Sequence, residues 1–542
     1  MNPITSHRKA EKLLGTKSRF LLRVEALEDR TVPAITASLQ DGHILMINGN
    51  GNSETLSITA QSAIGGFTVS GTGYASTNFS GVDQIKINTG SGNDAITVDL
   101  SAAADLSLDF NINAGIGNDT VTLTTNGVDL DDEVLISADL GTGNNQFTAT
   151  FNGMIEEGAQ FQVDVTAGNG NDKATINFEN LIAGQVAVDV NLGTGNNTST
   201  LDFAADVTAS AALQLTLTGG ANNDTANLYM DGSIEGSVDV TANLGAGNDA
   251  FSLTVAEDLG AESAMQLTVN GGAGNDKISV NVTSDVDGDA SFIINAGGGN
   301  DDVTVDVGGD VSADLALDID LGAGNNRLDV TLSGDFSDTS SLQLDVTAGS
   351  LQDTVNIDFE EEFAGDANLN VDLGIGNDNL TLTENGDIVE GASFRAIVKG
   401  GLGNDRITIE GDAEISGDVT LDVDGGIGND ILDQFFSGDF TATANLTSNI
   451  VGGLGTDRVN SRFEGEMDGS LNLDWDLVLG TDFTDLSFTG SVVADFLFQM
   501  ALQGGLGNDR SNFNLATLID ADLDFDLNSS GVESQFGLPT TL

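Results

Sequence analysis

The sequence predicts an all-β chain folded as a parallel β-solenoid, or β-helix, of about 17 coils with about 26 residues each. Three observations support this. A five-residue motif, Gly-x-Gly-Asn-Asp, recurs through most of the 542 residues. The segments on both sides of the motif alternate apolar and polar residues, which is typical of half-buried strands. No proline occurs between Pro33 and Pro539, and proline would interrupt strand pairing.

The composition excludes several classes of function. The chain carries 84 acidic and 17 basic residues, a formal net charge of −67. Non-specific nucleic-acid binding needs surplus Lys and Arg, and docking on anionic lipid needs basic clusters, so neither is expected. The absence of cysteine excludes disulfides, Cys-ligated metals and thiol nucleophiles. Because 39% of the residues are hydrophobic and alternate in register, the acidity does not indicate disorder.

Residues 1–34 form a basic leader with seven basic and four acidic residues. Its string Val24-Glu25-Ala26-Leu27-Glu28-Asp29-Arg30-Thr31-Val32-Pro33-Ala34 resembles the "LExR…P" leader of secreted or surface proteins of planctomycete bacteria. The resemblance implies export, and therefore an extracellular or cell-surface location. The alternative is an amphipathic N-terminal helix of a cytoplasmic protein. No window reaches the roughly 18 apolar residues of a membrane helix, so no membrane span is expected.

Two end segments flank the repeats. Residues 35–88 are predicted to form an N-terminal cap and a first irregular coil, because Gly49-Asn50-Gly51-Asn52 is a partial copy of the motif. Residues 89–510 carry the solenoid repeats, and residues 511–542 are predicted to form a C-terminal cap. Caps are needed because open strand edges invite pairing with other chains. End-to-end self-association of the rods is therefore a further expectation.

The motif keeps a constant phase over 400 residues, with spacings of 25, 26 or 27 residues. Two copies are degraded: those at Gly349 and Gly480 read Gly-Ser-Leu-Gln-Asp and Gly-Thr-Asp-Phe-Thr. The first residues of all copies are Gly90, Gly115, Gly141, Gly168, Gly193, Gly220, Gly245, Gly272, Gly297, Gly322, Gly349, Gly374, Gly401, Gly426, Gly453, Gly480 and Gly505.

Each motif is expected to be a turn between two short strands. Val419, Leu421 and Val423 alternate with polar residues before one copy, and Ile278 and Val280 do so after another. Gly-Asp or Asp-Gly pairs near the middle of the repeat predict a second bend. An antiparallel meander with motif hairpins is the alternative, but it would need a second sheet to cover its apolar face, so we favour the solenoid.

In a solenoid, the fifth motif residues lie in one column. Neighbouring carboxylates about 4.8 Å apart repel by roughly 0.9 kcal/mol in water and about 3.5 kcal/mol at an effective dielectric constant near 20. A row of such pairs is costly against a folding stability of about 5–15 kcal/mol, so something should neutralise it. The column comprises Asp94, Asp119, Asp172, Asp224, Asp249, Asp276, Asp301, Asp353, Asp378, Asp405, Asp430, Asp457 and Asp509.

All of these aspartates except Asp353 are predicted metal ligands, with Ca²⁺ as the cofactor, because carboxylate, amide and carbonyl oxygens gather at the turn. Ten copies also carry Asn or Asp two residues before the first glycine, as at Asn270 and Asp424. Gly271-Gly272-Ala273-Gly274-Asn275-Asp276 and Gly400-Gly401-Leu402-Gly403-Asn404-Asp405 resemble the RTX calcium-binding β-roll repeat, GGxGxD. RTX units recur every nine residues, whereas this motif occurs once per coil, so the resemblance implies one calcium row at most.

Alternatives to calcium remain open. The acidic edge could be solvated and screened by diffuse counterions, and the asparagines could form a hydrogen-bonded ladder along the rod. Basic residues that directly follow the motif could pair with aspartates of the same or an adjacent coil, each exposed pair contributing under about 1 kcal/mol. These residues are Lys173, Lys277, Arg327, Arg406, Arg458 and Arg510.

The sequence indicates a secreted or cell-surface structural or adhesive repeat protein, with calcium and possible glycan or surface-protein partners. We do not expect an enzyme. A polysaccharide-acting β-helix enzyme is the alternative, but its acid–base chemistry needs a carboxylate pair placed in a cleft, and no coil has an insertion. Trp475 sits at an alternating strand position and is expected to fill the core rather than to stack on a sugar.

Overall fold

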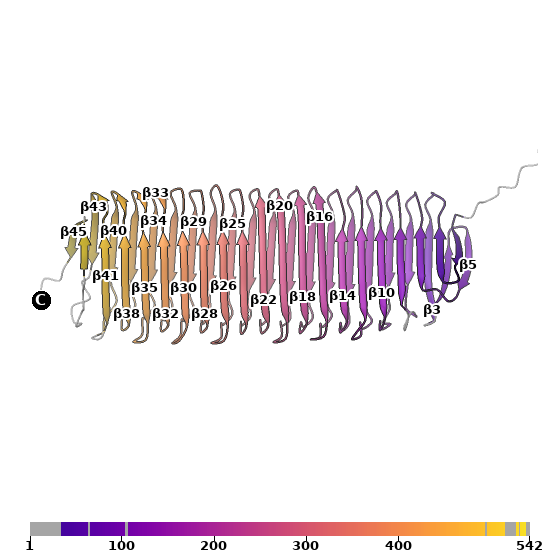
Figure 1. Cartoon of the computed structure of the whole chain (residues 1–542), viewed down its shortest axis with the longest axis horizontal. Helices are drawn as coiled ribbons and strands as arrows, with labels where there is room; N and C mark the ends of the chain where they lie inside the picture. Colours follow the sequence, from indigo (N-terminus) through magenta and orange to yellow (C-terminus); the bar gives the residue numbers. More distant parts are fainter. Residues whose placement is uncertain are drawn as a thin grey trace, which may run out of the picture.

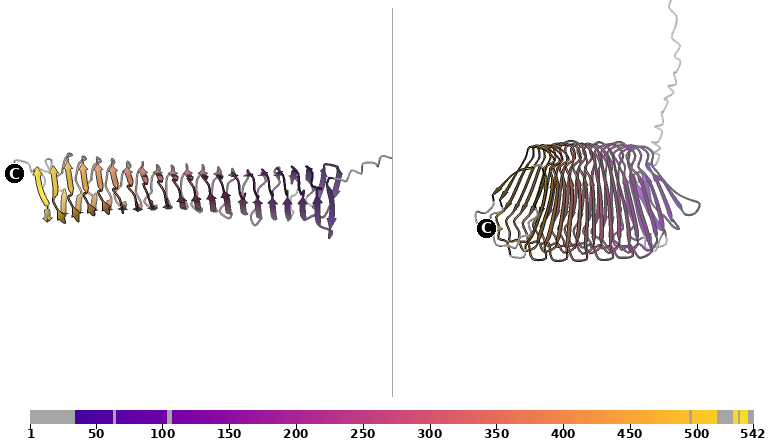
Figure 2. Two further views of the ribbon diagram at one scale, coloured as in Figure 1. Left: turned by 90° about the horizontal axis from the view of Figure 1, so that it is seen from above. Right: turned by 60° about the vertical axis from the view of Figure 1, so that its left-hand side comes forward.

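The computed structural model describes residues 34–62, 65–102, 107–493, 496–514, 527–530 and 532–537. This part of the chain contains strands and turns but no helix, and it forms a parallel β-solenoid of about 16 turns with roughly 26 residues each. The predicted fold class is therefore confirmed. The molecule is a long rod with its strands across the long axis (Figures 1 and 2). All of the predicted leader except Ala34 lies outside the described residues, as does part of the segment 511–542.

One layer of the rod is a 20-stranded sheet, which we call sheet A. Its strands are β1 (Thr36–Gln40), β2 (Ile44–Asn48), β6 (Gln84–Asn88), β8 (Leu108–Asn113), β10 (Glu133–Asp139), β12 (Gln160–Thr166), β14 (Gln185–Asn191), β16 (Ala212–Ala221), β18 (Ser237–Ala246), β20 (Ala264–Ala273), β22 (Asp289–Gly298), β24 (Asp314–Asp320), β26 (Ser341–Thr347), β28 (Asp366–Asp372), β30 (Ser393–Lys399), β32 (Asp418–Asp424), β35 (Asn445–Val451), β38 (Ser470–Asp476), β41 (Leu497–Gln503) and β44 (Leu527–Ser530).

The opposite layer is sheet B. Its strands are β3 (Thr55–Ser62), β4 (Gly66–Gly71), β5 (Tyr74–Phe79), β7 (Ala95–Asp99), β9 (Thr120–Thr124), β11 (Gln146–Phe151), β13 (Lys173–Phe178), β15 (Thr198–Phe203), β17 (Thr225–Met230), β19 (Ala250–Val255), β21 (Lys277–Val282), β23 (Asp302–Val307), β25 (Arg327–Leu332), β27 (Thr354–Phe359), β29 (Asn379–Glu384), β31 (Arg406–Gly411), β34 (Ile431–Phe436), β37 (Arg458–Phe463), β40 (Phe483–Phe488), β43 (Asp509–Asn514) and β45 (Val532–Gly537).

Equivalent residues of successive turns are paired directly. In sheet A, Val134 of β10 is paired with Leu108 of β8 on one side and with Phe161 of β12 on the other, all in parallel register. Sheet B follows the same rule, with Phe147 between Val121 and Ala174. These parallel pairings exclude the antiparallel meander for the repeats.

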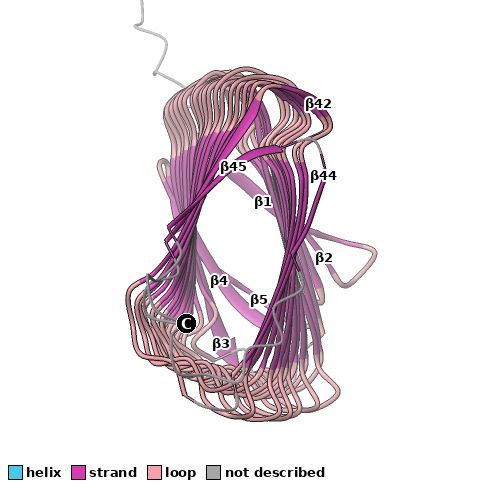
Figure 3. Ribbon diagram, turned by 90° about the vertical axis from the view of Figure 1, so that its left-hand side faces the viewer, coloured by secondary structure: helices cyan, strands magenta, loops and turns pink. Residues whose placement is uncertain are grey.

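The core lies between the two sheets. Figure 3, which looks along the rod, shows the sheets as two facing layers joined by turns at both edges. In the strands of the repeats, alternate residues point inward and are buried, as the alternation predicts. Like residues stack from turn to turn, for example Phe178 on Phe203 with ring centroids 4.8 Å apart. Trp475 is fully buried, which confirms its prediction as a core residue.

Two kinds of turn close each coil. The motif turn leads from a strand of sheet A to one of sheet B. The predicted second bend leads back, and it contributes a buried apolar residue that is paired between coils, as in Leu130, Ile155 and Ile182. At the N-terminal end the pairing becomes antiparallel, since β1 is paired with β2, and β3 is followed by β4 and β5.

Candidate functional site: a buried carboxylate column

The motif turns stack so closely that their third position strongly favours glycine. Gly274 has φ 138° and Gly403 has φ 149°, in the region that residues with a Cβ rarely adopt. A Cβ on Gly274 would lie 1.3 Å from the carbonyl oxygen of Gly247 in the preceding turn, and one on Gly403 equally close to that of Gly376. The glycines therefore allow successive turns to stack at the spacing of paired strands.

The fifth motif residues form one column, as predicted, but they point into the rod. Each of the twelve predicted metal ligands is at most 3% exposed. The structure therefore differs from the expectation of a solvated acidic edge. The side chains turn inward because the backbone amides of neighbouring coils, which the strands leave unpaired here, need an acceptor.

One carboxylate oxygen of each column residue binds the preceding turn. The backbone N–H of Asp249 donates to Oδ1 of Asp276 at 2.8 Å, and that of Asp276 donates to Oδ1 of Asp301 at 2.8 Å. The same bond recurs along the rod. In its first example the backbone N–H of Glu54 donates to Asp94, and in its last the backbone N–H of Asp482 donates to Asp509. Asn145, Asn197 and Asn326 occupy the column without interrupting it, since their Oδ1 atoms also accept.

The fourth motif residues form a second column with the opposite direction. Oδ1 of Asn248 accepts from the backbone N–H of Asn275 in the following turn at 2.8 Å, and Oδ1 of Asn275 accepts from Asn300 at 2.7 Å. Some amides also contact each other, as Asn429 Nδ2 does with Asn404 Oδ1. The predicted asparagine ladder is therefore present, mainly as bonds from side chain to backbone. Together the two columns connect most neighbouring turns in both directions.

Sequence reasoning missed Asp482 and misread one copy. Leu479 is paired with Leu454, and Gly480 with Gly455, so the copy runs from Val478 to Asp482 rather than starting at Gly480. Val478 occupies the first position with φ 56°, and Asp482 is fully buried in the column. The spacing carried the signal, because Asp482 follows Asp457 by 25 residues and precedes Asp509 by 27, the usual alternation. Asp353, which was not a predicted ligand, also lies in the column.

The other carboxylate oxygen of each aspartate has no partner. Among the described residues, Oδ2 of every column aspartate is buried without a hydrogen bond. Burial raises the pKa of Asp119, Asp224 and Asp301 to about 6, and neighbouring column carboxylates add to the rise, while the hydrogen bond from the adjacent backbone opposes it. The same causes raise the pKa of Asp353 and Asp430 to about 7. These five aspartates therefore hold protons more readily than exposed aspartates do.

The Asn and Asp side chains two residues before the motif lie outside this column. Asp320, Asp372 and Asp424 are exposed, and each accepts a hydrogen bond from the backbone N–H of the first motif glycine at 2.9–3.1 Å. They stabilise the turn from the solvent side. The structure therefore separates them from the buried oxygens with which a joint ligand set was expected.

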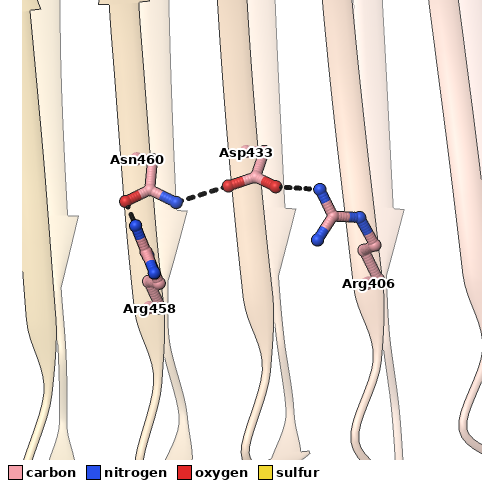
Figure 4. A network of polar contacts seen from close by, with 4 residues as sticks. All are labelled: Arg406, Asp433, Arg458 and Asn460. Carbon is pink, nitrogen blue, oxygen red and sulfur yellow. Dashed lines mark hydrogen bonds and ion pairs between the residues drawn. The ribbon is translucent and has the colours of Figure 1, made fainter.

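Basic residues after the motif pair on the outer face of sheet B instead of with the column. Arg327 pairs with Asp329 of its own strand, and Arg406 pairs with Asp433 of the next coil. Figure 4 shows Asp433 between Arg406 and Asn460, with Arg458 donating to Asn460. The predicted pairing within a coil or with an adjacent coil occurs for these two arginines, but it does not neutralise the column.

The fit of calcium to these residues is partial. Calcium takes six to eight oxygen ligands, and the described residues contain no group of three or more acidic or histidine side chains placed around one point. Where glycine precedes the motif, two oxygens crowd against it: a Cβ on Gly271 would lie 2.5 Å from the carbonyl oxygen of Ala296 and 2.9 Å from Asp276 Oδ2. Gly400 has the same relation to Gly425 and Asp405. Each such turn therefore brings one carboxylate and one carbonyl oxygen together, which is fewer than calcium takes.

Comparison with known proteins gives no further assignment: no family model, curated protein or solved structure matches this chain. Within the described ranges, no helix is long and apolar enough to cross a membrane.

Proposed function

We propose that this chain is a secreted or cell-surface repeat protein with a structural or adhesive role, in which the solenoid acts as a stiff rod. The observation that carries the proposal is the uninterrupted in-register stacking from β7 to β43, with coil lengths that stay within two residues. Regular coils without inserted loops favour a structural element over an enzyme, because catalysis on a solenoid needs a cleft with distinct residues. The leader string is the support for export.

We further propose that Ca²⁺ stabilises the rod at the turns where glycine precedes the motif. The ion would be held by Oδ2 of the column aspartate that lies beside that glycine, which is Asp224, Asp276, Asp405, Asp430 or Asp457. When bound, the ion would supply the positive charge that the buried carboxylates lack. Because calcium would bind only the folded form, it would raise stability in proportion to ln(1 + [L]/Kd).

Thermal unfolding followed by circular dichroism tests the calcium proposal. At pH 7.5 the melting temperature should rise on going from EGTA to millimolar Ca²⁺, and equal Mg²⁺ should have a smaller effect. A quintuple variant with Asn at the five aspartates should lose the calcium response. A wild-type melting temperature that does not respond to Ca²⁺ would leave an acidic solenoid without specific metal sites.

Glycan-array binding tests the adhesive role separately. Wild-type protein that binds a class of glycan would support adhesion. Absence of binding to any glycan or surface preparation would leave the structural role alone.

A further inference from the structure

A row of exposed apolar side chains follows the motif turns near the C-terminal end of the rod. They occupy the second motif position in six successive turns and are 43–75% exposed. We call them the apolar stripe: Ile375, Leu402, Ile427, Leu454, Leu479 and Leu506. In nine of the ten turns from Ser91 to Ala323 the position is small or polar, with Ile116 as the exception.

The stripe is rigid and continuous. Ile375, Leu402 and Ile427 are joined by parallel bridges. From Ile427 onward the turns form their own four-stranded sheet, β33 (Ile427–Gly428), β36 (Leu454–Gly455), β39 (Leu479–Gly480) and β42 (Leu506–Gly507), at the edge where Figure 1 labels β33. Side chains about 4.8 Å apart make a stripe roughly 24 Å long. A partner that packs on it would not need to order a flexible segment.

The motif turns that carry the stripe expose no charged side chain, although the chain has a formal charge of −67. Their other exposed positions are glycine and either asparagine or threonine, because the fifth-position aspartates are buried. Two copies that met along most other faces would bring carboxylates together, and like charges across an interface are costly. A second copy can approach this edge with little repulsion.

The two flanks of the stripe differ in charge. On the sheet A side, every second turn carries an aspartate: Asp372, Asp424 and Asp476. The turn between the first two of them carries the basic residue Lys399. On the sheet B side, Arg406, Arg458 and Arg510 alternate with Ile431 and Phe483. All three arginines are exposed, and a guanidinium has five donors, so the contacts of Arg406 and Arg458 within the chain leave donors for a partner.

These flanks select one orientation. A two-fold axis parallel to the rod places the arginine flank of one copy beside the aspartate flank of the other, with each arginine one turn away from an aspartate. A two-fold axis across the rod places arginines beside arginines. We propose that two copies of this chain pack side by side and parallel through the apolar stripe, with each stripe residue meeting its own counterpart.

Sedimentation velocity over a range of concentrations tests the pairing. Wild-type protein should show a monomer–dimer equilibrium, and the double variant Ile427→Thr/Leu454→Thr should remain monomeric at all of them. Threonine is the native residue at this position in Thr142 and Thr194, so the melting curve should not change at a concentration where both proteins are monomeric. The control Ala246→Thr, at the same position outside the stripe, should still dimerise. A monomeric wild type, or a double variant that dimerises fully, would overturn the proposal.

Cysteine cross-linking tests the orientation, since the chain contains no cysteine. In the parallel pair Leu402 meets Leu402, so the single variant Leu402→Cys should form a disulfide-linked dimer under mild oxidation. In an antiparallel pair Leu402 would meet Leu479, and only a mixture of Leu402→Cys with Leu479→Cys would cross-link. The second result would overturn the parallel arrangement. Ala442→Cys, at an exposed position in the turn between β34 and β35 on the opposite edge of the rod, should not cross-link.

Discussion

A column aspartate supplies an acceptor to a backbone amide that the strands leave unpaired. At the N-terminal end of the column, Oε1 of Glu54 accepts from the backbone N–H groups of Asn50 and Asn52 in its own turn. Asp and Asn both accept in the column, and what they share is a side-chain oxygen rather than a charge. The sequence contained this information, because Asn replaces Asp at the fifth position in three copies. It could not show that the side chains point inward, since acidic residues are usually exposed.

Substitution of Asp276 should separate the acceptor from the charge. Asp276→Asn keeps Oδ1 for the amide of Asp249, so in EGTA at pH 7.5 it should preserve or raise stability. Asp276→Ala leaves that buried N–H unpaired and should cost about 1–3 kcal/mol. Denaturant unfolding with hydrogen exchange at Asp249 measures both effects. Equal losses in the two variants would contradict the acceptor role.

Glu384 is a second buried carboxyl group, at an inward position of sheet B that phenylalanine occupies in Phe359. It is 7% exposed and borders a cavity of about 20 Å³ that Ile409 and Phe436 also line. Burial raises its pKa to about 8, and Asp387 and Asp412 add to the rise. The protonated form is therefore the stable one in the folded chain at neutral pH.

The pH dependence of the Glu384→Leu variant follows from this shift. Because folding raises the pKa of Glu384, its contribution to the free energy of unfolding is fully present below about pH 4.5 and is lost as the pH rises through about 8. The variant should therefore gain stability over the wild type with rising pH, by at most roughly 5 kcal/mol above pH 8. Urea unfolding of both proteins at pH 5, 7 and 9 measures the difference. A difference that stays constant with pH would show that Glu384 does not titrate in this range.

At the scale of the element, strand alternation and motif spacing predicted a short strand on each side of the motif and the parallel, in-register stacking of successive coils; the division into two sheets came from the structure. The phase of the copy at Val478 was wrong because glycine was taken as the marker of the first position, whereas the backbone there accepts valine at φ 56°. The position that cannot vary freely is the third, where Cβ space is absent. Only Asn222 and Leu351 replace glycine there, both at positive φ.

A matched pair of glycine substitutions tests this account of the turn. Gly403→Ala would place a Cβ 1.3 Å from the carbonyl oxygen of Gly376 and should cost about 2–4 kcal/mol. Gly298→Ala, at the second motif position, meets no atom within 4 Å, and Ala273 and Ala323 occupy that position in adjacent turns. Its stability should be unchanged or slightly higher in thermal unfolding. Similar losses for both would contradict the steric explanation.

At the scale of the whole molecule, each coil contacts mainly its two neighbours, so stability is nearly a sum over coils and their interfaces. Nearly every coil adds one carboxyl group to the buried column, so the effect of the column on stability grows with the number of coils. Composition predicted an acidic molecule and the need for compensation. It could not predict that the compensation must occur inside, because that depends on which way each turn directs its fifth side chain.

The most direct test is the free energy of unfolding in EGTA between pH 4 and 8. Column aspartates with pKa values raised to about 6, as in Asp301, and to about 7, as in Asp430, bind more protons in the folded state than in the unfolded state across this window. Stability should be highest at pH 4, the lower end of this window, and should fall steadily up to pH 7. A free energy of unfolding that is constant or rises over this range would contradict a buried, uncompensated carboxylate column.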